Sequence, residues 1–199
     1  YRHVDLTGFA KEYDGGTITP PKEPSPTNMG EPSGLPDSEM SDKYFVFVHG
    51  FNIDGQNARG WNAEVFKRLY SLGNRARFVG VTWNGTPPSL IQDKYLDYHK
   101  AVFQAFQAGD GLAGALGLNS ADVTIAAHSL GNMVVSHAIQ SGGFQPKSYF
   151  MINAAVPMEA YVPAVSNQKG SGTAYERMTE DNWKGKDDRL FASNWHRLF

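Results

Sequence analysis

Short apolar runs alternate with helical patterns between residues 44 and 152, and this alternation restricts the fold more than any other feature. The runs are continuous, which is typical of parallel strands that are covered on both faces. Strands joined through helices need right-handed crossovers, so the pattern predicts an α/β domain with a mostly parallel sheet and helices on both faces. The predicted strands are 44–48, 78–83, 122–127 and 149–152, and the predicted helices are 61–72, 92–108 and 130–140.

The segments outside this pattern differ in composition. Six prolines fall between residues 20 and 36, among Gly, Ser, Glu and Lys. Since proline fixes φ and lacks a backbone donor, we interpret residues 20–42 as a linker. Residues 1–19 form an N-terminal extension, which is either an edge strand or the tail of an upstream module. Residues 43–199 are then the α/β domain.

The charge balance and the lack of cysteine exclude several classes of protein. The net charge is −2 and the pI is near 6.3, whereas nucleic acids and anionic membranes attract clustered basic residues. No apolar run is long enough to cross a bilayer. The chain has no cysteine, which excludes disulfides, a thiol nucleophile and thiolate-bound zinc. The lack of cysteine does not determine the cellular compartment, and we prefer a secreted or periplasmic location.

A serine lies at the junction between the third predicted strand and the helix that follows it. The junction reads Ala127-His128-Ser129-Leu130-Gly131. A sharp strand-to-helix turn holds such a serine in a strained backbone conformation, with its hydroxyl above the sheet. The residues two before and two after it must be small, because chain segments approach closely there. Gly131 meets this need fully and Ala127 adequately, so the pattern favours a nucleophilic Ser129.

This junction and the order of the predicted elements resemble the α/β-hydrolase superfamily. The Ala-x-Ser-x-Gly form, in place of the common Gly-x-Ser-x-Gly, is similar to that of small bacterial lipases and esterases. An apolar strand ending in His49-Gly50-Phe51 stands upstream, where the family keeps its oxyanion loop. The resemblance covers residues 44–156. It implies the α/β-hydrolase fold and a serine carboxylic-ester hydrolase that forms an acyl-enzyme on Ser129.

Ester hydrolysis also needs donors aimed at the carbonyl oxygen on which negative charge develops. The backbone N–H of Leu130 follows Ser129 at a predicted helix N-terminus, where free amides favour an anion. The resemblance implies that the backbone N–H of Phe51 is the second donor. Losing one such donor typically removes about 3–4 kcal/mol of transition-state stabilisation. We therefore predict an oxyanion hole formed by the amides of Phe51 and Leu130.

Other candidate features are interpreted as structural. Residues 109–114 spell the glycine fingerprint of dinucleotide sites, but they follow a helix rather than a strand, so we expect a flexible loop. We call the strand-to-helix turn at residues 127–131 the elbow. His128 is expected to pack beside it, because the His128 side chain points away from that of Ser129. His49 is expected to brace the oxyanion loop. No metal site and no cofactor are predicted.

The other members of a catalytic triad are harder to find. In this fold the acid and the histidine follow the serine on loops after later strands, but no apolar strand follows Ala155. Asp187 and His196 occur in the right order, although a base on a helix lacks strand-end support. We therefore expect a sheet without its last strands in this chain. The acid and the histidine would lie on a further segment or on a second polypeptide.

The expected substrate is a small-molecule or lipid ester that enters at the carboxyl ends of the strands. Trp83, Met158 and Tyr161 are expected to bind its apolar or aromatic part, and the irregular stretch after Tyr161 is long enough to form a lid. Thioester and amide hydrolysis use the same machinery and stay open. The alternative function is a non-catalytic binding or structural module of a larger secreted protein. A histidine within reach of Ser129 would argue against that alternative.

Overall fold

The computed structural model describes residues 1–7, 13–14, 17–18, 40–85 and 94–156. Within them, one sheet has the strands β1 (Arg2–Asp5), β4 (Tyr44–Val48), β5 (Arg77–Thr82), β6 (Val123–His128) and β7 (Ser148–Ile152). The helices are α1 (Gly55–Ser71), α2 (Lys94–Leu116) and α3 (Gly131–Gln140), with a short 3-10 helix η2 (Ser120–Asp122). A separate antiparallel pair joins β2 (Tyr13–Asp14) to β3 (Thr17–Ile18). The five-stranded sheet belongs to the unit Tyr1–Ala155.

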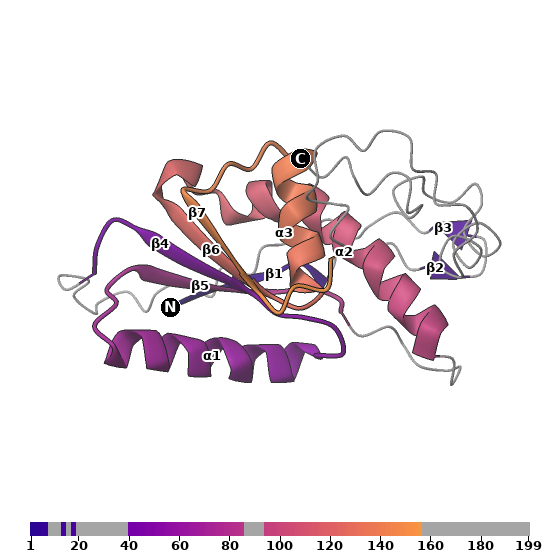
Figure 1. The fold of residues 1–199 in the computed structure, drawn as a ribbon, viewed down its shortest axis with the longest axis horizontal. Coiled ribbons are helices and arrows are strands. Elements are labelled where there is room, and N and C mark those ends of the chain that lie inside the picture. The colour runs from indigo at the N-terminus through magenta and orange to yellow at the C-terminus, as the bar shows by residue number, and fades with distance from the viewer. Residues whose placement is uncertain (8–12, 15–16, 19–39, 86–93, 157–199) are drawn as a thin grey trace. The chain divides into compact units, whose positions relative to one another are not determined.

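All strand pairs of the five-stranded sheet are parallel, in the order β1-β5-β4-β6-β7 (Figure 1). The predicted parallel sheet is therefore confirmed. β1 pairs with β5 along its whole length and lies at the edge of the sheet, so residues 2–5 of the N-terminal extension form an edge strand, one of the two alternatives that the sequence left open. Because the strands run in one direction, the carboxyl ends of β4, β5 and β6 meet at the same edge of the sheet.

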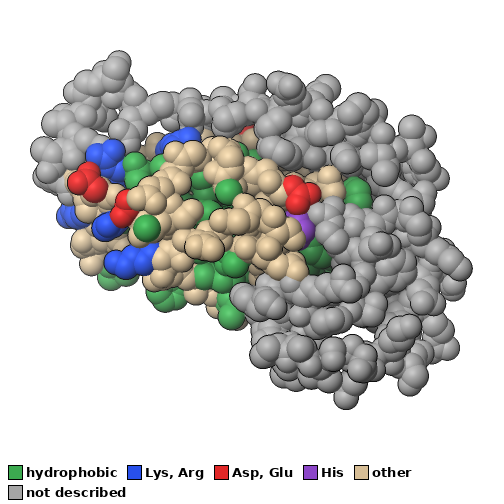
Figure 2. All heavy atoms as spheres, turned by 90° about the horizontal axis from the view of Figure 1, so that it is seen from above, with side chains coloured by type: hydrophobic (Ala, Val, Ile, Leu, Met, Phe, Trp, Pro, Cys, Tyr) green, Lys and Arg blue, Asp and Glu red, His purple; other side chains and the backbone are tan. Residues whose placement is uncertain are grey.

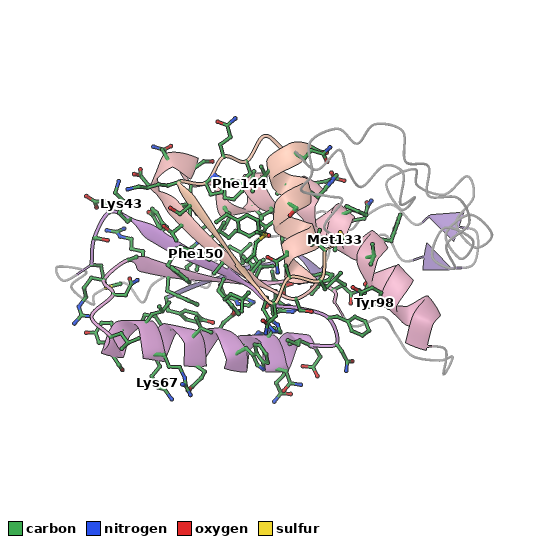
Figure 3. All side chains as sticks on the ribbon, viewed as in Figure 1. Lys43, Lys67, Tyr98, Met133, Phe144 and Phe150 are labelled. Atoms are coloured by element: carbon green, nitrogen blue, oxygen red, sulfur yellow. The ribbon has the colours of Figure 1, made fainter. Side chains whose placement is uncertain are left out.

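Helices cover both faces of the sheet, as predicted. α1 lies on one face, whereas α2 and α3 lie on the opposite face (Figure 1). On the α1 face, Phe47, Phe78 and Ala126 form a buried cluster against apolar side chains of the helix. On the other face, Met133 and Phe144 are each 1% exposed (labelled in Figure 3). This two-sided burial explains why the strands read as continuous apolar runs.

α1 begins before Trp61, the first residue of its predicted range. Asp54 caps the helix, because its carboxylate accepts the Asn57 backbone N–H at 2.8 Å and the Asn57 Nδ2 at 2.9 Å. Gly73 follows the helix with a φ of 87°, a conformation that favours glycine. The capping residues therefore define the helix more accurately than its apolar pattern does.

α2 is longer than the sequence predicts, and it contains the glycine fingerprint. The flexible loop predicted at residues 109–114 is wrong, because the helix continues to Leu116. Gly109 allows a close approach to α3: a Cβ there would lie 2.7 Å from the Val134 carbonyl oxygen. Leu112 is fully buried in the same region. Packing between the two helices thus outweighs the low helix propensity of the glycines.

β7 has a neighbouring strand on one side only, within the described residues. It pairs with β6, and its large apolar side chains Phe150, Met151 and Ile152 are 56%, 51% and 42% exposed. Phe150 is labelled on this strand in Figure 3. Exposed apolar side chains on an unpaired strand edge favour pairing with a further segment.

The described surface carries charges of both signs. Figure 2 shows basic, acidic and apolar side chains interspersed on one face. Lys43 pairs with Asp122, and Glu64 pairs with Lys67 and Arg68. Exposed pairs of this kind contribute little to stability, because water and salt screen them. Among the described helices, none combines the length and the apolarity that a membrane span requires.

Candidate active site

The chain turns from β6 into α3 through Ser129, whose backbone is in the left-handed conformation. Its φ is 51°, which costs a residue other than glycine about 1–2 kcal/mol. Hydrogen bonds to the end of β7 and the residues after it hold this turn. The Ser129 N–H donates to the Ile152 carbonyl oxygen at 2.9 Å, and the Ala155 N–H donates to the Ser129 carbonyl oxygen at 3.1 Å. The strained turn expected from the sequence is therefore present.

Two glycines allow this elbow and the loop after β4 to approach each other. A Cβ on Gly131 would overlap with the carbonyl oxygen of His49. A Cβ on Gly50 would lie 2.8 Å from the Ser129 Cβ. The small residue predicted at position 131 is confirmed. Nothing in the sequence indicates that position 50 needs glycine, because its neighbour Ser129 is brought there by the tertiary fold.

His49 ties the loop of residues 49–52 to the end of β5. Its Nε2 accepts the Trp83 backbone N–H at 3.2 Å, so Nδ1 carries the proton and donates to the Gly50 carbonyl oxygen at 2.9 Å. The Trp83 indole N–H donates to the His49 carbonyl oxygen at 2.8 Å, and the two rings stack with centroids 5.7 Å apart. The bracing role predicted for His49 is confirmed.

Acid is expected to destabilise the protein through this histidine. Burial lowers the pKa of His49 from 6.5 to about 4. Between these values the unfolded chain binds a proton that the folded chain does not bind. The stabilising effect is complete above pH 6.5, and up to about 3 kcal/mol is lost as the pH falls toward 4. Urea unfolding near neutral pH and at about pH 4.5 should show a smaller acid loss in His49→Gln than in the wild type. Equal losses would contradict this prediction.

Trp83 is 1% exposed, and two residues later the Gly85 carbonyl oxygen accepts the Asn52 N–H at 3.0 Å. This hydrogen bond is a second link between the loop of residues 49–52 and the segment that follows β5. Substrate binding by Trp83 stays a prediction, and it would require the ring to leave this buried position.

The two amides expected to form an oxyanion hole lie on either side of the elbow. Phe51 follows Gly50, which packs against Ser129, and Leu130 is the N-cap residue of α3. No hydrogen bond from either N–H is found within the described residues. The ring of Phe51 packs edge-on against that of Tyr98 on α2, with centroids 5.4 Å apart (Tyr98 is labelled in Figure 3). Neither amide is engaged by the part of the chain that the structure describes, and the oxyanion hole stays a prediction.

A buried asparagine in the first turn of α3 also supports the elbow. Asn132 is fully buried, and its Nδ2 donates to the carbonyl oxygens of Ala127 at 3.0 Å and Ser129 at 2.8 Å. Its Oδ1 accepts the Tyr149 hydroxyl at 2.7 Å. Sequence reasoning misses this residue, since an asparagine near a helix start is common and its partners become neighbours only in the fold.

Comparison with known protein families agrees with this geometry. The family described as alpha/beta hydrolase of unknown function (DUF900) matches residues 35–156, which is more than half of the chain. The chain belongs to this family of α/β hydrolases. No curated protein and no solved structure matches the chain significantly. The α/β-hydrolase fold expected from the sequence is thus confirmed. The family's description names no substrate, so the likeness to lipases stays a prediction.

In the described part of this α/β hydrolase, no histidine hydrogen-bonds to the Ser129 hydroxyl. His49 is fixed in its loop, and His137 pairs with an aspartate of α2 at 2.6 Å. His128 lies against Trp61, with ring centroids 5.4 Å apart, which agrees with the packing role predicted for it. These three histidines therefore make other contacts, and the base expected for Ser129 stays a prediction.

The fold brings together part of the predicted site. Ser129, Leu130 and the loop that carries Phe51 meet at the carboxyl edge of the sheet. Trp83, a predicted substrate contact, is buried after β5. The remaining predicted residues lie outside the described part of the chain: Met158, Tyr161, Asp187 and His196.

Proposed function

We propose that this α/β hydrolase is a serine carboxylic-ester hydrolase that forms an acyl-enzyme on Ser129. The observation that carries the proposal is the left-handed Ser129 between β6 and α3, with a φ of 51°. This conformation costs free energy, and such strain is concentrated at functional sites. Ser129 is also the residue that the fold brings next to Gly50 and to the N-terminus of α3.

In the proposed reaction Ser129 acts as the nucleophile, and two backbone amides stabilise the charge that develops. The Ser129 oxygen attacks the ester carbonyl carbon, and the hydroxyl proton passes to a base. The N–H groups of Leu130 and Phe51 stabilise the negative charge on the carbonyl oxygen, and the dipole of α3 favours the same anion. The base then gives its proton to the leaving alcohol as the tetrahedral intermediate collapses to the acyl-enzyme. In the second half, the base takes a proton from the attacking water and returns it to the Ser129 oxygen as the acid leaves.

The proposed substrate is a small-molecule or lipid ester with an apolar acyl or aromatic part. The rings of Phe51 and Tyr98 lie beside one of the proposed oxyanion donors, which supports this choice. Trp83, Met158 and Tyr161 stay the proposed substrate contacts. Apolar walls with a few polar groups are typical of such binding sites.

The base is proposed to come from a second polypeptide that pairs with β7. No described histidine hydrogen-bonds to Ser129, and β7 has an open edge within the described residues. A strand added there would cover the exposed Phe150 and Ile152 side chains. If the added strand runs parallel to β7, its carboxyl end lies on the same side as Ser129, since the Ser129 N–H donates to Ile152 at the end of β7. The loop after that strand could then bring an acid and a histidine to the site.

A non-catalytic binding or structural module is the second candidate function. The observation that favours it is the same lack of a described histidine at the Ser129 hydroxyl. A serine without a base is a weak nucleophile at neutral pH. The reactivity of Ser129 therefore separates the two candidates.

Labelling with a serine-reactive fluorophosphonate tests the proposed function on protein that is isolated together with any polypeptide that co-purifies with it. The native protein is expected to take up one label on the peptide that contains Ser129, whereas heat-denatured protein takes up none. Ser141, the exposed residue after the same helix, serves as the control serine that stays unlabelled. Native protein that remains unlabelled would favour the binding module.

Native mass spectrometry of the labelled sample tests the partner. A labelled complex heavier than the 21.9 kDa chain would support a second polypeptide. A labelled and active species of 21.9 kDa alone would contradict the partner and leave the nucleophile in place.

A further inference from the structure

The carbonyl oxygen of Ser129 accepts hydrogen bonds from three donors. They are the Asn132 N–H at 3.1 Å, the Asn132 Nδ2 at 2.8 Å and the Ala155 N–H at 3.1 Å. This carbonyl belongs to the same peptide group as the Leu130 N–H. A trans peptide is planar, so its N–H points opposite to its C=O, and no cis bond occurs among the described residues. The donors that hold the Ser129 C=O therefore also set the direction of the Leu130 N–H.

The side chain of Asn132 is itself held on two sides. Its Nδ2 also donates to the Ala127 carbonyl oxygen at 3.0 Å, and its Oδ1 accepts the Tyr149 hydroxyl at 2.7 Å. The side chain is fully buried. Rotating the amide would leave buried polar groups unpaired, at a cost of about 1–3 kcal/mol each. Asn132 thus connects the end of β6 to the elbow in one fixed orientation.

β7 takes part in this arrangement through two residues. The Ile152 carbonyl oxygen accepts the Ser129 N–H at 2.9 Å, which holds the elbow directly. Tyr149 acts through the Asn132 amide, which its hydroxyl orients. Both contacts restrain the peptide planes on either side of Ser129.

We propose that Asn132, oriented by Tyr149, is a positioning residue that aims the Leu130 N–H at the oxyanion. This inference rests on the proposed function. Asn132 does not touch the substrate, since it acts through the Ser129 carbonyl. Negative charge on the oxyanion develops only in the transition state. A Leu130 N–H that points in the wrong direction therefore lowers kcat and leaves KM nearly unchanged.

Variants of both residues test the proposal. Asn132→Asp keeps the shape of the side chain but presents an oxygen to the carbonyl oxygens of Ala127 and Ser129. It is expected to lower kcat on nitrophenyl butyrate by about 10- to 100-fold, somewhat less than the loss of a whole oxyanion donor. Tyr149→Phe removes one hydroxyl and is expected to lower kcat by about 3- to 10-fold. KM should stay within about twofold in both.

Tyr44→Phe is the matched control. Tyr44 begins β4, at the opposite end of the strand from the elbow, and its variant also loses one phenol hydroxyl. Its kcat should be that of the wild type. All rates are measured at a temperature at which circular dichroism shows each protein to be fully folded.

Rates measured over a range of pH distinguish a misdirected Leu130 N–H from a general loss of protein stability. A carboxyl group that faces two carbonyl oxygens has a raised pKa, and once protonated it can donate to one of them. The ratio of wild-type to Asn132→Asp kcat is therefore expected to shrink as the pH falls from about 8 to about 5.5. Dividing by the wild-type rate at each pH removes the titration of the catalytic base. The corresponding ratio for Tyr149→Phe should stay constant.

The possible results are distinct. A wild-type protein that does not react with the fluorophosphonate refutes the proposed function and this inference with it. A reactive wild type together with unchanged kcat in the folded Asn132→Asp variant overturns the inference alone. Losses of kcat that simply follow Tm across the variants do the same. If Asn132→Asp does not fold, Tyr149→Phe decides, and wild-type kcat in that variant overturns the proposal.

Discussion

Ser129→Ala is expected to lower the turnover of nitrophenyl butyrate by about 10⁴-fold or more, because the acyl-enzyme can no longer form. The fold should survive. Alanine keeps the Cβ that packs against Gly50, and no hydrogen bond of the Ser129 hydroxyl is found within the described residues. Initial rates, corrected for spontaneous hydrolysis, measure the effect, and circular dichroism confirms the fold.

Ser141→Ala is the control for that experiment. Ser141 is the exposed C-cap residue of α3, and its hydroxyl contacts only the neighbouring Gln140 side chain within the described residues. Its turnover should equal that of the wild type. Turnover near the wild-type value in Ser129→Ala would remove Ser129 from the mechanism and move the proposal toward the binding module.

Gly131→Ala is expected to have the largest effect on stability. The added Cβ would overlap with the His49 carbonyl oxygen and would lie 2.8 Å from the Val48 carbonyl oxygen. Both are backbone atoms at the end of β4, an interior strand of the sheet, so neither can move aside like a flexible side chain. Overpacking of this kind costs about 3 kcal/mol, which corresponds to a fall in Tm of about 10 °C. Fluorophosphonate labelling should also be lost, because β4 and the elbow would separate.

Gly60→Ala provides the opposite outcome as a control. Gly60 is exposed in the middle of α1, and a Cβ there would have no heavy atom within 4 Å. Replacing a helical glycine with alanine stabilises by about 0.5–1 kcal/mol. Thermal unfolding of the two variants should therefore shift in opposite directions. A Gly131→Ala protein with the stability and labelling rate of the wild type would contradict the close approach of β4 and the elbow.

Local patterns predict the elements that form the sheet. The run at residues 44–48 becomes β4 with the predicted bounds, because five consecutive apolar residues suit a strand that is buried on both faces. The elbow is predicted for a similar reason. Its requirement for a small residue at position 131 follows from the turn itself, and the turn is visible as an apolar run that changes into a helical pattern.

Local patterns fail where packing outweighs propensity. Residues 109–114 contain three glycines and are predicted as a loop, yet they form the last turns of α2. A glycine costs about 1 kcal/mol in an isolated helix. Here Gly109 allows α2 to approach α3 closely, and this contact involves a helix that is separated along the chain. The pairing of β1 with β5 is likewise a long-range contact.

The sequence by itself determined the class of the fold, the order along the chain of the strands and helices between residues 44 and 152, and the place of Ser129 at the end of β6. These follow from periodicity and from turn chemistry, which act over a few neighbouring residues. Only the tertiary structure decided how the elbow is held. Gly50, Asn132 and Tyr149 belong to different elements, and each has an ordinary local sequence. Their roles depend on hydrogen bonds and close contacts between segments that are distant along the chain, and neither spacing nor propensity encodes those.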